Sequence, residues 1–101
     1  GNNGSCYFSD TEANELAKQV ENESFPDDQQ RVANLAAKNK CMTTAQIKMV
    51  AAKFSFDDNR LSFMKTAYDN CSDQSNYYKL MDSFVHSSDK EELQKFIDSK
   101  R

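Results

Sequence analysis

Apolar residues recur along most of the chain at the spacing of an α-helix, and this pattern constrains the fold more than any other feature. Six stripes follow the i, i+3, i+4, i+7 pattern or a close variant of it. They are Leu16, Ala17 and Val20; Val32, Leu35 and Ala36; Ile47, Val50, Ala51 and Phe54; Leu61, Met64, Ala67 and Tyr68; Tyr77, Leu80, Met81 and Phe84; and Leu93, Phe96 and Ile97. The sequence therefore predicts an all-α fold of about six short helices.

The length and the scarcity of turn residues support this prediction. The 101 residues include two glycines and one proline, whereas all-β domains use both residues freely at turns. A chain of this length forms one domain with a modest core. We expect a flexible N-terminal arm over residues 1–8, with Gly1 as a scar of processing, and a single helical domain over residues 9–101.

Polar residues ahead of the stripes predict where the helices begin. Ser9-x-x-Glu12 and Thr43-x-x-Gln46 have the form of a capping box, in which two side chains satisfy backbone N–H groups reciprocally. Aspartate is also a favoured N-cap. The predicted caps are Ser9, Asp28, Thr43, Asp57, Asp73 and Asp89.

Two aspartate pairs follow an aromatic residue, in SFPDD (24–28) and FSFDD (54–58). A calcium loop is one interpretation, but such a loop needs about five ligand positions in twelve residues and a glycine at its turn. FSFDDNRL has no glycine, so we expect no metal here. We interpret the second pair as a helix start at Asp57, with Phe56 packed against Leu61 as a hydrophobic staple.

The same two segments mark an internal repeat. Residues 24–54 and 55–84 each contain a Ser-Phe start, an asparagine, a polar cap and a closing phenylalanine. Helix-hairpin units of about 30 residues are typical of α-solenoids. We expect tandem helix-hairpin units stacked as a short solenoid-like bundle; the alternative is an irregular bundle whose caps look alike because good caps are few.

Several separated blocks resemble a known family. The blocks are Cys41–Lys48, Phe54–Asp58, Ala67-Tyr68, Asp73–Tyr78 and Ser87–Leu93. From about Cys6 to Ile97 the chain resembles the bacterial domain-of-unknown-function family numbered 4476. It departs from the family pattern at Pro26 and at Ala13-Asn14. The resemblance implies an all-helical domain, usually at the C-terminal end of an exported bacterial protein, and it implies no activity.

Three cysteines, Cys6, Cys41 and Cys71, allow three single pairings that leave one thiol over. Cys41 and Cys71 occupy similar points of the two units, and neighbouring helices pack about 8–10 Å apart, whereas a disulfide needs Cα atoms within about 7 Å. We expect a Cys6–Cys41 bond, because the arm can reach a neighbour and because the family resemblance implies that this pairing can form. The alternative is three reduced cysteines, as in a cytosolic protein.

The sequence offers no catalytic constellation and no cofactor site. His86 is the only histidine, so sites with two histidine ligands cannot form, and a glycine-rich phosphate loop is absent. Residues 43–68 have the spacing of a helix-turn-helix, but the recognition helix would begin with Asp57 and Asp58, whose charge opposes DNA phosphates. With a net charge of −3, we expect no nucleic-acid partner.

Several large aromatic residues exceed what one core face can bury. The candidate partner face comprises Phe25, Phe63, Tyr77 and Tyr78. Helical repeats use such residues to bind other proteins or peptides, although the same residues can fill gaps between units.

We therefore expect a non-catalytic interaction or structural module of a larger exported bacterial protein. We expect it to be monomeric, without membrane insertion, and periplasmic, outer-membrane-associated or secreted. The alternative class is a small-ligand-binding or enzymatic domain with a pocket between helix hairpins.

Overall fold

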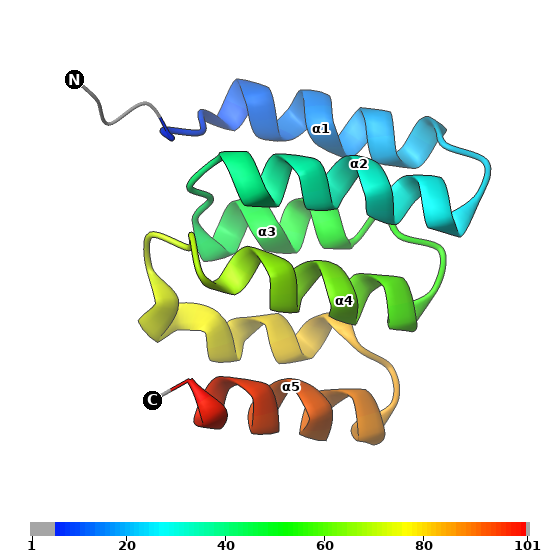
Figure 1. Ribbon diagram of the computed structural model, residues 1–101. Helices are drawn as coiled ribbons and strands as arrows, with labels where there is room; N and C mark the ends of the chain where they lie inside the picture. The colour runs from blue at the N-terminus through cyan, green and yellow to red at the C-terminus, as the bar shows by residue number, and fades with distance from the viewer. Residues whose placement is uncertain (1–5, 101) are drawn as a thin grey trace.

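The computed structural model describes residues 6–100, and it confirms an all-α fold (Figure 1). The helices are α1 (Asp10–Asn22), α2 (Pro26–Asn39), α3 (Thr44–Ala51), α4 (Asp57–Tyr68), the 3₁₀ helix η1 (Gln74–Ser83) and α5 (Ser87–Ser99). Within the described range there is no β-strand longer than a single bridge. Residues 1–5, which form most of the predicted arm, lie outside the described residues.

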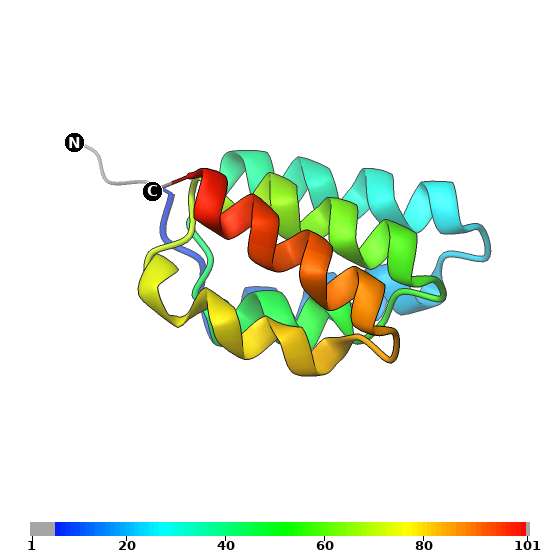
Figure 2. The same cartoon turned by 90° about the horizontal axis from the view of Figure 1, so that it is seen from below.

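The helices form two layers, and consecutive helices alternate between them (Figure 2). One layer contains α2, α4 and α5 side by side, and the other contains α1, α3 and η1. The stacked hairpins agree with the predicted architecture, while the sequence repeat itself stays a prediction. No helix between residues 6 and 100 has the length and apolar character needed to cross a membrane.

This alternation places three helix starts at each end of the molecule (Figure 1). We call the end where α1, α3 and η1 begin the tied end, comprising residues 6–9, 40–44 and 70–74. We call the end where α2, α4 and α5 begin the open end, comprising residues 23–28, 53–58 and 84–89. The two ends differ in chemistry, and the difference locates the candidate site.

The core lies between the two layers. Its largest fully buried side chains are Tyr77, Phe63, Met42, Ile47, Met64, Leu80, Leu93, Val20 and Val50. Helix α4 packs against α2, α3 and α5, so residues on several sides of it are covered. Phe63 is accordingly 0% exposed and its ring lies 5.4 Å from that of Phe54, so its prediction as part of a partner face is wrong.

Tyr77, also predicted on the partner face, is another core residue. Its hydroxyl donates to the backbone carbonyl of Met64, and its ring meets Tyr68 edge-on at 4.9 Å. Burial raises the pKa of the Tyr77 phenol, which therefore stays a neutral hydrogen-bond donor. The adjacent Tyr78 is exposed.

Two further expectations about packing require correction. Leu35, assigned to a buried stripe, is exposed, because α2 is buried through the small residues Ala33 and Ala37. The fifth helix is a 3₁₀ helix rather than the α-helix that the stripe indicated. Its buried residues Tyr77 and Leu80 are three apart, which is the repeat of a 3₁₀ helix.

Candidate functional site

At the tied end, both predicted capping boxes are confirmed. The Ser9 hydroxyl accepts from the backbone N–H of Glu12 at 3.1 Å, and the Glu12 carboxylate accepts from the N–H of Ser9 at 3.1 Å. Thr43 and Gln46 make the same pair of bonds at 3.2 and 3.0 Å. The bond from the Ser9 N–H helps hold the pKa of Glu12 below its ordinary value.

Asp73 lies at the start of η1 as predicted, but its side chain does not cap that helix. Its carboxylate accepts from the backbone N–H of Thr44 at 2.6 Å and from the Thr44 hydroxyl at 3.0 Å, so it caps the neighbouring α3. Burial would raise the pKa of Asp73, but hydrogen bonds from Asn76, Thr44 and Cys71 together lower it. Asp73 is therefore a structural carboxylate that joins η1 to α3.

The predicted Cys6–Cys41 disulfide is present, with a Cα–Cα distance of 5.1 Å. The Cys41 N–H also donates to the Cys6 carbonyl at 2.7 Å, and Phe8 is buried. Residues 6–8, predicted as part of a flexible arm, are thus held against the domain. Cys71 is a buried free thiol, and burial raises its pKa.

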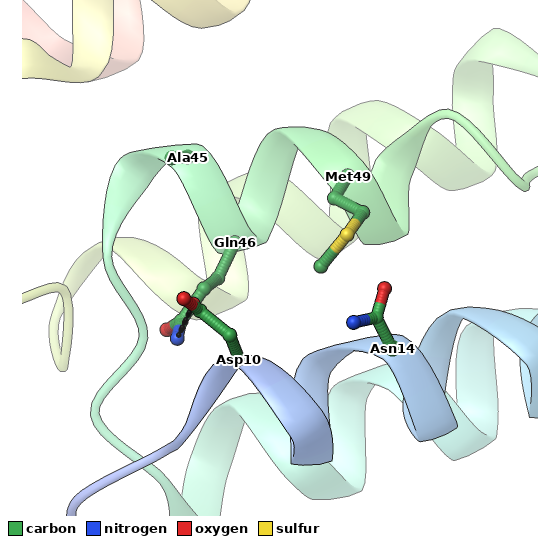
Figure 3. Close-up of a pocket in the computed structure, with 5 residues that line it drawn as sticks. All are labelled: Asp10, Asn14, Ala45, Gln46 and Met49. Carbon is green, nitrogen blue, oxygen red and sulfur yellow. Dashed lines mark hydrogen bonds between the residues drawn. The ribbon is translucent and has the colours of Figure 1, made fainter.

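Two surface hollows flank α3 on the outside of its layer. One, of about 320 Å³, lies between α1 and α3, where Asn14 and Met49 point toward one another (Figure 3). Beside them, the buried Gln46 amide already donates to the Phe8 carbonyl and the Asp10 carboxylate. The other, of about 180 Å³, lies beside Asp73. The best-placed polar groups in both hollows are bonded within the protein and maintain the fold.

The open end begins its helices without side-chain caps. The N-cap residues of α2, α4 and α5 are Phe25, Phe56 and His86, and none of them makes a side-chain cap hydrogen bond. The caps predicted at Asp28, Asp57 and Asp89 are therefore wrong. Asp57 is the first residue of its helix, and Asp28 and Asp89 are the third. In these positions their charge favours the helix start through the dipole.

Large apolar side chains are exposed where caps would be expected. Phe25 is 68% exposed, Phe56 is 58% exposed and Val85, next to the third cap, is 84% exposed. The predicted staple between Phe56 and Leu61 is wrong, because Leu61 is buried while Phe56 faces solvent. We call Phe25, Phe56 and Val85 the apolar row.

Hydrogen bonds fix the backbone beneath the apolar row. The Gln29 side chain, which is buried, donates to the Glu23 carbonyl at 3.3 Å and accepts from the Ser55 N–H at 3.2 Å, joining two of the three loops. Arg60 donates to the backbone carbonyls of Ala51 and Phe54, and it forms an ion pair with Asp57. The two phenylalanines are thus presented by loops of defined conformation.

A hollow of about 380 Å³ connects the starts of α4 and α5. It is lined by Ser55, Phe56, Asp57, Asp58, Val85, His86 and Asp89. Burial raises the pKa of the Asp89 carboxyl, and Asp57 and Asp58 raise it further, while His86 opposes them. No group of His, Cys, Asp and Glu between residues 6 and 100 has the arrangement to hold a metal ion.

The structure brings together part of the predicted partner face. Phe25 belongs to the apolar row, whereas Tyr78 is exposed within η1, outside the three segments of the open end. Sequence reasoning missed Phe56 and Val85 as surface residues. The sequence contains a signal that could have identified Phe56. The Ser-Phe dipeptide occurs twice before an acidic helix start, and assigning the phenylalanine of both copies to the surface would have been correct.

Comparison with known proteins identifies one family. Residues 7–97 match the family described as Domain of unknown function (DUF4476). Searches of curated proteins and of solved structures find no match. Since the matched segment covers most of the 101 residues, the chain belongs to the DUF4476 family.

Proposed function

We propose that this domain is a non-catalytic interaction module of a larger exported bacterial protein, and that the open end is its binding surface. The observation that carries the proposal is the apolar row, which extends across the starts of the three helices of one layer. The loops that carry its members are neighbours, because Gln29 joins the first two loops and one hollow is lined by both Phe56 and Val85.

The comparison with the tied end supports a role in binding. A hydroxyl or carboxylate at an N-cap stabilises a helix by about 0.5–2 kcal/mol relative to a residue that cannot cap. The chain uses such residues at Ser9 and Thr43, yet phenylalanine occupies the N-cap of α2 and α4. Exposed aromatic residues contribute strongly to protein interfaces, so binding is a reason to keep them there.

The disulfide supports the export part of the proposal. Disulfides form and persist mainly in oxidising compartments such as the periplasm, and Cys6–Cys41 closes a long segment of this chain. An exported parent protein also agrees with what the family resemblance implies.

The alternative of a small-ligand-binding or enzymatic domain has less support. The polar groups best placed to act in the two hollows beside α3, those of Gln46 and Asp73, are bonded within the protein. The buried thiol of Cys71 has a raised pKa, which disfavours the thiolate that a nucleophile requires.

Site-specific photo-cross-linking in the producing bacterium tests the proposal. A photoreactive phenylalanine analogue replaces Phe25, Phe56 or Val85 in the full-length protein, and replaces Leu35, which is also exposed but lies within α2, as the matched control. We expect the same discrete adduct from all three open-end positions and none from position 35. Adducts of equal yield at position 35, or none at the open end, would contradict the proposal.

A further inference from the structure

The open end combines its apolar row with an excess of acidic over basic side chains. Its three segments contain six acidic side chains and one lysine, a net charge of −5; since the whole chain carries −3, the remainder carries +2. The acidic residues are Glu23, Asp27, Asp28, Asp57, Asp58 and Asp89. The surface is thus apolar and anionic at once.

Internal ion pairs neutralise only part of this charge. Asp28 pairs with Arg31, Asp57 pairs with Arg60, and the single lysine of the open end, Lys53, pairs with a glutamate of α1. Within residues 6–100, no lysine or arginine lies within salt-bridge distance of the remaining acidic side chains. These are Glu23, Asp27, Asp58 and Asp89.

We infer that the open end binds a partner segment in which lysine or arginine alternates with apolar residues. This inference rests on the proposed function and names the partner chemistry for the same surface. Apolar side chains of the segment would cover Phe25 and Phe56, while its cations would meet the carboxylates that lack an internal partner. Charge complementarity of this kind both accelerates association and selects the partner.

The hollow between α4 and α5 has the composition that suits one long cationic side chain. Phe56 and Val85 provide apolar contact for the methylene stem of a lysine or arginine, which packs well on such surfaces. Asp58 and Asp89 line the same hollow and can accept hydrogen bonds from its charged head. Burial raises the pKa of Asp89 and the neighbouring carboxylates of Asp57 and Asp58 raise it further, and an incoming cation would offset the repulsion among these three carboxylates.

The same charges disfavour other occupants of the apolar row. Nucleic acid and anionic lipid would be repelled by the four carboxylates of this surface that lack an internal ion-pair partner. A second copy docking through its own open end would place two such surfaces against each other. A basic and apolar protein segment is therefore the occupant that the charge favours.

Titration with synthetic peptides of known composition tests the inference. The first is an eight-residue peptide in which lysine alternates with leucine and phenylalanine; the second has glutamate in place of lysine, and the third has serine in place of the apolar residues. Amide shifts in the NMR spectrum of the whole domain report where each binds. We expect the first peptide to bind at residues 23–28, 53–58 and 84–89, and the other two to bind at least about tenfold more weakly.

Two charge variants separate specific contacts from general attraction. The double variant Asp58→Asn/Asp89→Asn is expected to bind the lysine-containing peptide about fivefold or more weakly than wild type. Asp98→Asn, an exposed carboxylate near the opposite end of α5, changes the net charge in the same direction and should leave affinity almost unchanged. Unchanged thermal unfolding of each variant would confirm that the fold is intact.

The remaining outcomes overturn the inference in distinguishable ways. Equal binding of the glutamate peptide at the open end would reject a basic partner but leave the open end as a binding surface. Binding of the lysine peptide elsewhere, or no binding of any peptide, would reject the inference, and the cross-linking experiment would then decide separately whether the proposed function also fails.

Discussion

The tied end and the open end each begin three helices, yet they satisfy those helix starts in opposite ways. At the tied end, Ser9 and Thr43 cap their own helices, Asp73 caps the neighbouring one and a disulfide holds the entering segment. At the open end, Phe25 and Phe56 occupy N-cap positions without any side-chain cap.

This difference indicates that the residues of the two ends have different roles. The polar residues of the tied end make internal bonds and leave little free to bind another molecule. The exposed residues of the open end make few internal bonds, while the buried Gln29 and the partly buried Arg60 hold the backbone beneath them. We conclude that the tied end stabilises the fold and that the open end presents a surface.

The largest predicted effect compares two phenylalanines that the sequence placed on the same face. Phe63→Ala should reduce the free energy of unfolding by about 3–5 kcal/mol, because it removes a fully buried ring from the core. Phe25→Ala should change it by no more than about 0.5 kcal/mol, because that ring is mostly in solvent. Urea unfolding measures both, and equal losses would contradict the assigned positions.

Removal of the disulfide has the next largest predicted effect. Cys6→Ser should lower the free energy of unfolding by about 2–4 kcal/mol, because the disulfide no longer restricts the unfolded chain to a long closed loop. The matched variant Cys71→Ser keeps the disulfide, so its stability should still fall when a reductant is added. If a reductant left the unfolding free energy of the wild-type protein unchanged, this account of the tied end would be contradicted.

Asp73→Asn should cost about 1–3 kcal/mol, because it weakens charge-assisted bonds to Thr44. The pKa of Asp73 is lowered from 3.8 by folding, so its contribution is present at neutral pH and is lost as pH falls below about 4. Below about pH 4, the difference in unfolding free energy between wild type and variant should therefore become smaller. Asp82→Asn, exposed on the same helix, is the control, and a difference that persists at low pH would count against the assignment.

The smallest effect compares one hydroxyl-bearing residue from each end. Thr43→Ala should cost about 0.5–2 kcal/mol, since it breaks a capping box. Ser55→Ala should cost less than about 0.5 kcal/mol, because Ser55 bonds Gln29 through its backbone N–H, which the substitution keeps. Thermal unfolding of the two variants measures both losses of stability. A larger loss for Ser55→Ala than for Thr43→Ala would contradict the proposed difference between the two ends.

The accuracy of the sequence predictions follows the same division. A capping box fixes its register through two reciprocal residues, so Ser9 with Glu12 and Thr43 with Gln46 were located correctly. A lone aspartate stabilises a helix start from the cap or from the first turn alike, so Asp57 could not fix where its helix begins.

The buried aromatics were misjudged because a stripe assumes one buried face. Helix α4 contacts α2, α3 and α5, and this three-sided burial covers Phe63. Tyr77 belonged to the predicted apolar stripe and Tyr78 did not, and the structure places them inward and outward in the same way. The burial of Phe63 is not visible before the layers are known, and the open end itself exists only once three separate helix starts meet.

The unfolding free energy of the triple variant Phe25→Ser/Phe56→Ser/Val85→Ser tests the central claim most directly. We predict a value within about 1.5 kcal/mol of wild type, since each exposed side chain contributes little to folding. The same variant should no longer bind the lysine-containing peptide. A loss of several kcal/mol would show that the apolar row stabilises the fold, and it would contradict the division between the two ends.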